Sequence, residues 1–465
     1  MKRPRKAGFM RAVMKRSKGL VAMGLCAVLL AACVPPARQP PAATVELTAT
    51  PTVQAMAVPP ATDTPVPTAT PTMTIAPLPT ATPTVTDTPV PTATPTPPPT
   101  ATPIPTDTPL PTNTPLPTST PLPAGPTRMR SPEYCMQAFL WWRPETADRD
   151  LRLIKEAGFE WVKQGFGWRD IEGAGKGIFD WSRTDRIVAQ VEQYGLKLVV
   201  RLDHQPYWAG GGFPTNGPPD DYGDFGDFCY ALASRYRGRI SAYEIWNEPN
   251  LAREWGGKVP NAAEYAALLK VAYRRIKEAD PNAMVISAGL TPTGTGPPTA
   301  IPDDVYLEQM YQAGAKDYFD VLGVHAAGYK APPELSPDEA AANEFYGGQR
   351  FFCFRRVEDL RAIMVKYGDA DKQVAVLEFG WTTDPIHPEY AWHAVTEEQQ
   401  ADYLVRAYQY AKEHWSPWIG MMCLIYIADP DWTEEDEQYW WAITYPDYPE
   451  TKVRPAYEKL KAMPK

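Results

Sequence analysis

The chain has 465 residues, a formal net charge of −9 and 53 prolines. So acidic a protein is a poor partner for nucleic acids and other polyanions, and we exclude nucleic-acid binding. Its six cysteines and five histidines show no spacing typical of a zinc site, so we expect neither a metal nor an organic cofactor.

The first 32 residues have the order of a bacterial lipoprotein export signal. The first nineteen carry eight Lys or Arg and no acidic residue, an apolar stretch follows from Leu20 to Leu30, and Ala31-Ala32-Cys33 comes next. The apolar run is shorter than the roughly 20 residues that cross a bilayer. We expect cleavage before Cys33 and lipidation of its thiol, which anchors the protein to a membrane at the bacterial cell surface. An ordinary signal peptide with an incidental cysteine is the alternative, and it also takes the protein out of the cytoplasm.

Residues 33–127 are rich in Pro, Thr and Ala, and the ten residues 62–71 recur identically at 86–95. There is almost nothing apolar to bury, and the prolines remove backbone hydrogen-bond donors. We therefore predict a disordered, polyproline-like spacer that holds the following domain away from the surface.

Residues 128–465 alternate short apolar runs with longer amphipathic stretches, which is typical of an α/β fold. One such stretch, Ala262–Ala279, is preceded by Asn261 as a helix cap and followed by Asp280-Pro281. Eight such repeats in one domain predict a closed (β/α)8 TIM barrel, which we expect to be monomeric. The predicted strands are Cys135–Leu140, Trp161–Phe166, Leu196–Leu202, Ile240–Trp246, Ala283–Ala288, Val321–Val324, Val374–Glu378 and Met421–Ile427.

The domain contains four cysteines, Cys135, Cys229, Cys353 and Cys423. We expect buried thiols or one disulfide at most. Cys135 and Cys423 fall on the first and last strands, which are neighbours in a closed barrel.

Working residues of such barrels lie at the carboxyl ends of the strands. Those ends combine polar groups with aromatic rings, the mixture that sugars require because their hydroxyls need partners and their apolar faces stack on rings. Two of the groups are glutamates, on strands that face each other across the mouth of the barrel. The predicted site residues are Gln164, Trp168, Arg201, Asp203, His204, Asn247, Glu248, His325, Glu378, Trp381 and Tyr426.

Two motifs carry a resemblance to a known group of enzymes: Tyr243-Glu244-Ile245-Trp246-Asn247-Glu248-Pro249-Asn250 and Leu377-Glu378-Phe379-Gly380-Trp381. They resemble the acid/base and nucleophile motifs of clan A glycoside hydrolases, of the family 39 and family 5 (cellulase-like) types. The resemblance implies that Glu248 is the acid/base, Glu378 the nucleophile and Asn247 a donor to the sugar 2-hydroxyl.

Elementary chemistry supports the same roles. Retaining hydrolysis uses one ionised and one protonated carboxyl group, and a nearby cationic Arg201 would favour an ionised Glu378. Pro249 predicts an extended backbone at Glu248. Strict alternation along the strand would send Asn247 and Glu248 to opposite faces, so both reach the cleft only if the strand end bulges or twists. We expect Glu244 to pair with an arginine in the helical layer.

The chain departs from the family pattern in two places. The tyrosine that often follows the sixth-strand histidine closely comes late, at Tyr329, and Ile425-Tyr426-Ile427 replaces the tryptophan common at the end of the eighth strand. Trp381 and Tyr426 are either stacking platforms or core residues. The aromatic-rich stretch 432–448 is either an outer wall of the cleft or a hairpin packed on the barrel.

The sequence thus predicts a retaining β-glycoside hydrolase that acts on an extracellular poly- or oligosaccharide. A non-catalytic glycan-binding lipoprotein is the alternative from another class, and a transglycosidase with the same residues is a third possibility.

Overall fold

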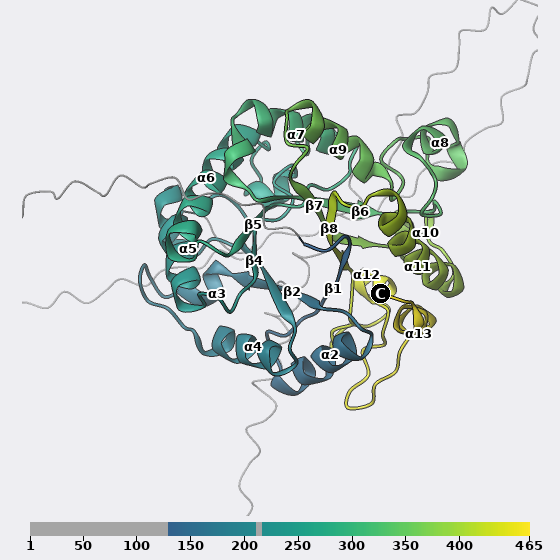
Figure 1. The fold of residues 1–465 in the computed structure, drawn as a ribbon, viewed down its shortest axis with the longest axis horizontal. Coiled ribbons are helices and arrows are strands. Elements are labelled where there is room, and N and C mark those ends of the chain that lie inside the picture. The colour runs from purple at the N-terminus through teal and green to yellow at the C-terminus, as the bar shows by residue number, and fades with distance from the viewer. Residues whose placement is uncertain (1–128, 211–215) are drawn as a thin grey trace, which may run out of the picture. The chain divides into compact units, whose positions relative to one another are not determined.

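The computed structural model describes residues 129–210 and 216–465. Eight parallel strands close into a barrel in which each strand pairs with the next along the chain and the last pairs with the first (Figure 1). The predicted (β/α)8 fold is therefore confirmed. The strands are β1 (Glu133–Gln137), β2 (Trp161–Gly167), β3 (Lys197–Asp203), β4 (Ala242–Ile245), β5 (Met284–Ser287), β6 (Val321–Ala327), β7 (Gln373–Gly380) and β8 (Ile419–Leu424).

Helices surround the barrel, and several shorter ones lie in the loops that follow the strands (Figure 1). The helices of eight or more residues are α2 (Pro144–Glu156), α4 (Ser182–Gln193), α5 (Tyr222–Arg235), α6 (Ala262–Ala279), α7 (Asp303–Gln312), α9 (Arg356–Lys366), α11 (Glu397–His414) and α13 (Pro455–Ala462). The shorter ones are α3 (Trp168–Glu172), α8 (Pro337–Ala342), α10 (Pro388–Ala391), α12 (Glu437–Trp441) and the 3-10 turns η1 (Tyr207–Ala209), η2 (Ala252–Trp255), η3 (Ala315–Tyr318) and η4 (Glu344–Tyr346).

Side chains alternate along each strand between the barrel interior and the helical layer. On β1, Cys135 joins a small apolar cluster inside the barrel, whereas Tyr134 and Met136 join the large core between the strands and the helices. The same alternation on β2 sends Trp161 inward and Val162 outward. This rule decides which polar side chains enter the barrel.

Each of the eight predicted strands is present, with bounds that differ by a few residues at the ends. The predicted helix Ala262–Ala279 is confirmed, and the side chain of Asn261 accepts hydrogen bonds from the backbone of Ala263 and Glu264. Strand β4 ends at Ile245, one residue before its predicted end, because Trp246 has a left-handed backbone with φ 73°.

A disulfide joins Cys135 of β1 to Cys423 of β8, across the seam where the barrel closes. Cys229 and Cys353 are buried free thiols. The sequence left two outcomes open, buried thiols only or one disulfide, and the structure shows one disulfide.

The predicted export signal, the lipidation site Cys33 and the Pro/Thr-rich spacer lie outside the described residues. Within residues 129–210 and 216–465, none of the helices has the length and apolar character needed to cross a membrane.

Candidate active site

The turn after β4 brings two site residues to the same place. Trp246 and Glu248 both have positive φ, 73° and 41°. The turn is fixed because the indole of Trp246 is buried and donates to the Glu254 carbonyl, while the Glu248 amide donates to the Gly289 carbonyl. Asn247 and Glu248 therefore both reach the group of polar side chains around Glu378, as the predicted twist of the strand end required. The extended backbone predicted for Glu248 is wrong, because these contacts outweigh the local preference imposed by Pro249.

Three groups that can exchange protons lie together at the ends of β4, β6 and β7. A carboxylate oxygen of Glu248, a ring nitrogen of His325 and a carboxylate oxygen of Glu378 all lie within 4.8 Å of one another. The His325 Nδ1 atom is 2.8 Å from Glu248 Oε1 and 3.8 Å from Glu378 Oε2. Gly289 makes room for this imidazole, since a Cβ there would lie 2.1 Å from the ring.

Glu378 is the more accessible of the two carboxylates, with 11% of its side chain exposed against 1% for Glu248. Lys163 Nζ lies 3.3 Å and Arg201 Nη1 3.4 Å from Glu378 Oε1. Burial alone would raise the pKa of Glu378, but His325, Lys163 and Arg201 together hold that pKa below its usual value. Glu378 is therefore a carboxylate near neutral pH, the form that a nucleophile needs.

Glu248 is held differently. Its Oε1 atom contacts His325, and its Oε2 atom lies 3.7 Å from the Nη2 atom of Arg253. Oε2 accepts no hydrogen bond from the described residues. The described residues therefore leave the hydrogen-bonding capacity of this buried oxygen unused.

Arg201 of β3 connects Asn247, in the turn after β4, with Glu378 of β7. Its Nε donates to Asp203 Oδ2 at 2.8 Å, and its Nη1 donates to Asn247 Oδ1 at 3.1 Å as well as to Glu378. With its oxygen engaged by Arg201, the Asn247 amide has a fixed orientation, with its NH2 group available as a donor.

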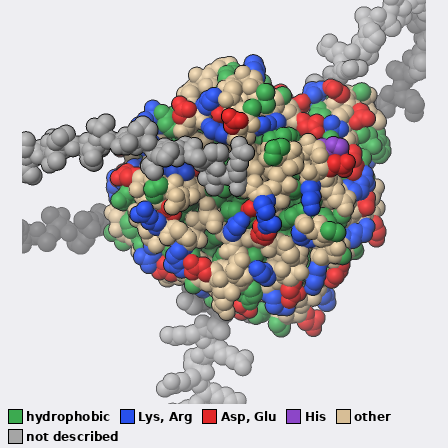
Figure 2. Space-filling model, in the orientation of Figure 1, with side chains coloured by type: hydrophobic (Ala, Val, Ile, Leu, Met, Phe, Trp, Pro, Cys, Tyr) green, Lys and Arg blue, Asp and Glu red, His purple; other side chains and the backbone are tan. Residues whose placement is uncertain are grey.

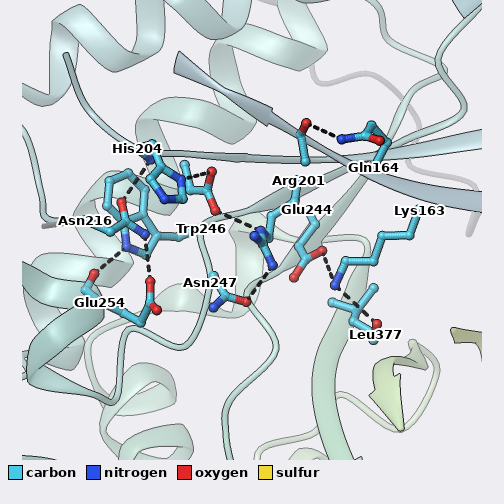
Figure 3. A network of polar contacts seen from close by, with 12 residues as sticks. Lys163, Gln164, Arg201, His204, Asn216, Glu244, Trp246, Asn247, Glu254 and Leu377 are labelled. Carbon is cyan, nitrogen blue, oxygen red and sulfur yellow. Dashed lines mark hydrogen bonds and ion pairs between the residues drawn. The ribbon is translucent and has the colours of Figure 1, made fainter. Parts of the chain in front are cut away.

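Asp203 bonds to His204, and Figure 3 shows the network continuing from His204 through Asn216 to Glu254. Burial would raise the pKa of Asp203, but His204 and Arg201 hold it well below its usual range. Burial, aided by the charge of Glu248, raises the pKa of Glu254 to about 7. These groups extend the polar network from Arg201 to the loop that contains Glu254.

Two of the predicted aromatic site residues lie in the core. Trp168 is fully buried, stacks on Phe228 with ring centroids 5.6 Å apart, and donates its indole N–H to Glu172. Its predicted contact with substrate is wrong, because other side chains of the protein surround the ring. Trp381 is also fully buried and donates to the Ala331 carbonyl, which favours the core role over the stacking role.

The remaining aromatic predictions fall in a second cluster above β8. Tyr426 is almost fully buried there between Phe139 and Trp432. Tyr329 belongs to the same cluster and packs edge-on against Phe352, with its hydroxyl 3.5 Å from the Pro292 carbonyl. Because Trp432 and Trp441 are buried in this cluster, the stretch 432–448 packs on the barrel.

Lys163 was missed by sequence reasoning, which chose Gln164 from the same strand. Gln164 instead accepts a hydrogen bond from Leu140 N and donates to Gly165 O. The useful signal was alternation: Val162 and Phe166 are apolar and face the helices, so Lys163 between them faces inward.

The predicted partner of Glu244 is also wrong. This glutamate is fully buried inside the barrel, where its Oε2 lies 2.9 Å from Lys163 Nζ. Figure 3 shows its carboxylate between Arg201 and Lys163. The error has a simple cause, since Glu244 stands two residues after Ala242, which also faces the interior.

Among the described residues, one group could hold a metal ion: Glu248, His325 and Glu378. Lys163 and Arg201 already place positive charge against Glu378, which opposes binding of a further cation at that carboxylate.

The structure thus places the glutamates of the two motifs near the carboxyl ends of β4 and β7 of an eight-stranded parallel barrel. Residues 122–316 match the family model for cellulase (glycosyl hydrolase family 5). Over these residues, which make up less than half of the chain, the protein is similar to the cellulase family, glycosyl hydrolase family 5.

A β-xylosidase of Geobacillus stearothermophilus is 28% identical over 164 residues, which cover 29% of this chain and 31% of that relative. The match therefore spans about a third of the curated relative. Solved structures with the same fold include a family 39 glycoside hydrolase from Bacteroides cellulosilyticus, with a TM-score of 0.52, 18% identity, and coverage of 72% of this chain and 63% of that one. Another is GH5_18 from Streptomyces cattleya, with a TM-score of 0.51, 13% identity, and coverage of 72% and 80%.

Proposed function

We propose that this protein is a retaining β-glycoside hydrolase in which Glu378 is the nucleophile and Glu248 the acid/base. The observation that carries the proposal is the approach of the two carboxylates, with one oxygen of each within 4.8 Å of the other. Retaining enzymes hold their carboxyl groups about 5–5.5 Å apart, whereas inverting enzymes separate them by about 6.5–9.5 Å to admit a water molecule.

The reaction takes two displacements. Glu378 attacks the anomeric carbon while the glycosidic C–O bond breaks, and protonated Glu248 gives its proton to the departing oxygen. Water then attacks the same carbon, Glu248 takes a proton from it, and the ester bond to Glu378 breaks. The environment of Glu378 supports this assignment, because the cations around it favour the ionised form.

Asn247, Arg201, Asp203 and His204 are the residues that we assign to substrate binding around the carboxylates, together with His325. The amide of Asn247 is oriented by Arg201 and suits a sugar hydroxyl. The match to a β-xylosidase makes β-linked xylosides the first candidate substrates. Endo-action on a polysaccharide and exo-action are both compatible with these residues.

A non-catalytic glycan-binding role is disfavoured because both carboxylates are present and close together. A transglycosidase would use the same residues, with a sugar replacing water as the acceptor.

We further propose that the protein is exported and tethered at the bacterial cell surface through lipidated Cys33. The basic and apolar start of the chain supports this location. The Cys135–Cys423 disulfide agrees with it, since disulfides persist in oxidising compartments. On the face of the barrel in Figure 2, acidic and basic side chains are intermixed.

The test is release of reducing ends from a panel of β-linked polysaccharides and xylosides by wild type, Glu378→Gln and Glu248→Gln. Wild type should cleave at least one substrate, and each variant should lose at least about two orders of magnitude in rate. Binding of a glycan by three equally inactive proteins would support the binding-module alternative. Equal activity in all three would refute the assignment of these residues.

A further inference from the structure

Two arginines at the start of helix α4 have no carboxylate partner among the described residues. Arg183 and Arg186 are three residues apart, so they lie on the same side of the helix. Arg183 makes neither a hydrogen bond nor an ion pair with the described part of the chain. Arg186 donates to neutral acceptors, the side chain of Gln190 and the carbonyls of Leu140 and Trp141, and so ties the loop after β1 to α4.

The two positive charges act on each other. Burial and the charge of Arg183 lower the pKa of Arg186, and the charge of Glu145 offsets only part of this effect. Asp170 and Asp180 lie near enough to Arg183 for its charge to act on them, but neither forms an ion pair with it. Two like charges without a neutralising partner destabilise the folded state, and a bound anion would remove that cost.

Two tryptophans in the loop after β1 lie against Arg183. The guanidinium carbon is 5.6 Å from the ring centre of Trp141 and 4.9 Å from that of Trp142. Trp141 is 6% exposed, and its buried indole N–H has no acceptor among the described residues. Trp142 is 38% exposed, so part of its ring faces solvent. We call Trp141, Trp142, Arg183 and Arg186 the arginine–tryptophan patch. It combines donors and cations with an exposed aromatic ring, which suits a ligand that has an anionic group beside an apolar face.

The arginine–tryptophan patch lies at the same end of the barrel as the candidate active site. Trp142 follows β1 and Arg183 lies at the start of α4, which follows β2, so both are at the carboxyl ends of the strands. Partial burial raises the pKa of Asp170, and the charges of His204, Arg169 and Arg183 act against that rise. Asp170 is therefore near Arg183 and also near His204, which belongs to the polar network that reaches Glu378 through Asp203 and Arg201.

We propose that the arginine–tryptophan patch binds a uronic acid unit of the substrate. The sugar ring packs on the exposed part of Trp142, its carboxylate pairs with Arg183, and Arg186 adds positive charge. The guanidinium fork matches the two oxygens of a carboxylate, and an indole suits the apolar face of a sugar ring. This inference rests on the proposed function, for which it names a substrate class.

The overall charge of the protein restricts the kind of acidic polysaccharide. A net charge of −9 repels a polymer that has a carboxylate on every unit. At physiological ionic strength, charges farther away than about 8 Å are largely screened, so a single carboxylate at the patch responds mainly to the nearby arginines. We therefore assign isolated uronic acids on an otherwise neutral β-linked chain.

Binding of two matched ligands tests the proposal. Oligosaccharides of glucuronoxylan have isolated uronic acids on a neutral β-linked xylan chain, and chemical reduction of the carboxyl groups gives their neutral counterparts. Dissociation constants for both are measured by calorimetry with the Glu378→Gln protein, so that hydrolysis does not interfere. This parent protein should bind the acidic ligand at least about tenfold more tightly than the reduced one, as a charge-assisted pair provides. Added salt should lower this ratio.

Variants made in the same parent separate the two parts of the patch. Arg183→Met should bring the ratio of the two dissociation constants to about one, whereas Arg183→Lys should keep part of it because lysine retains the charge without the fork. Trp142→Ala should weaken binding of both ligands, since both use the aromatic face. Arg237→Met is the matched control, because Arg237 is an exposed arginine after α5, at the opposite end of the barrel, and this variant should leave the ratio unchanged.

A purely structural role of Arg183 would lower the thermal stability of Arg183→Met and leave the ratio at its parent value, which would overturn the proposal. A ratio near one in the parent protein, or no binding of either ligand, would also overturn it. Failure of the proposed function is seen separately, because wild type would then release no reducing ends from either ligand, however tightly the acidic one binds.

Discussion

At the scale of single residues, the candidate active site depends on a backbone conformation that is unfavourable for the residues that adopt it. Trp246 and Glu248 adopt positive φ, which costs an L-residue roughly 1–2 kcal/mol. The indole of Trp246 stabilises this conformation, since it is buried against Phe225 and Trp255 and donates to the Glu254 carbonyl. The buried anchor thereby directs Asn247 towards Arg201 and Glu248 towards His325.

Replacement of the acid/base residue should lower the rate of hydrolysis by an amount that depends on the leaving group of the substrate. Glu248→Gln should slow hydrolysis of a substrate with a poor leaving group by about 10²–10⁴-fold, because general acid catalysis is lost. A dinitrophenyl glycoside should still form the glycosyl-enzyme, and added azide should restore turnover and yield a β-glycosyl azide. Product analysis by NMR tests this. An α-azide, or an equal loss with both substrates, would contradict the role of Glu248.

A second prediction concerns the stability of the fold against pH. The pKa of Glu254 is about 7 in the folded protein, above its unfolded value, so the folded state binds more protons in the intervening range. Its contribution to stability is therefore full below the unfolded pKa and falls as pH rises towards about 7. Glu254→Gln should gain stability relative to wild type by about 3–4 kcal/mol between acidic and mildly alkaline pH.

Urea unfolding at a series of pH values measures that difference. Glu389→Gln, which alters an exposed carboxyl group, is the control and should show no comparable trend. A constant difference between Glu254→Gln and wild type across the series would contradict the raised pKa.

At the scale of elements, helix α6 shows how local sequence signals stabilise the barrel. The Asn261 side chain accepts hydrogen bonds from the amides of Ala263 and Glu264. Asn261→Ala should lower the free energy of unfolding by about 1 kcal/mol, as loss of a helix cap usually does. Asn282→Ala, in the exposed turn after the helix, is the matched control for urea unfolding. Equal stability of the two variants would show that the cap contributes nothing.

The strands and most of the polar site could be predicted because alternation and strand ends are local properties. The motifs around Glu248 and Glu378 marked the ends of β4 and β7, and the structure places both carboxylates together. Arg201 was identified in the same way, and its contact with Glu378 is present.

The features that could not be predicted depend on contacts with segments that lie far away in the sequence. Lys163 and Gln164 are adjacent polar residues, and only the inward face of β2 distinguishes them. Trp168 follows β2 directly, but the packing of α5 against its ring places it in the core. Such packing arises from distant segments and leaves no local pattern.

At the scale of the whole domain, the disulfide closes the barrel between its first and last strands. Cys135 and Cys423 are 288 residues apart, so the bond restricts most of the unfolded domain. The double variant Cys135→Ser/Cys423→Ser should lose about 2–5 kcal/mol of stability. Urea unfolding measures the loss, and a reducing agent should destabilise wild type but leave this variant unchanged. An equal effect of reductant on both proteins would contradict a stabilising role.

Covalent capture of the intermediate tests the central claim most directly. The soluble domain is incubated with activated deoxyfluoro β-glycosides, which form the glycosyl-enzyme but hydrolyse slowly, and the labelled peptide is mapped by mass spectrometry. We predict a single sugar attached to Glu378, with no label in Glu378→Gln. A label on Glu248 or any other residue, or turnover of the parent substrate with inversion at the anomeric carbon, would contradict the account.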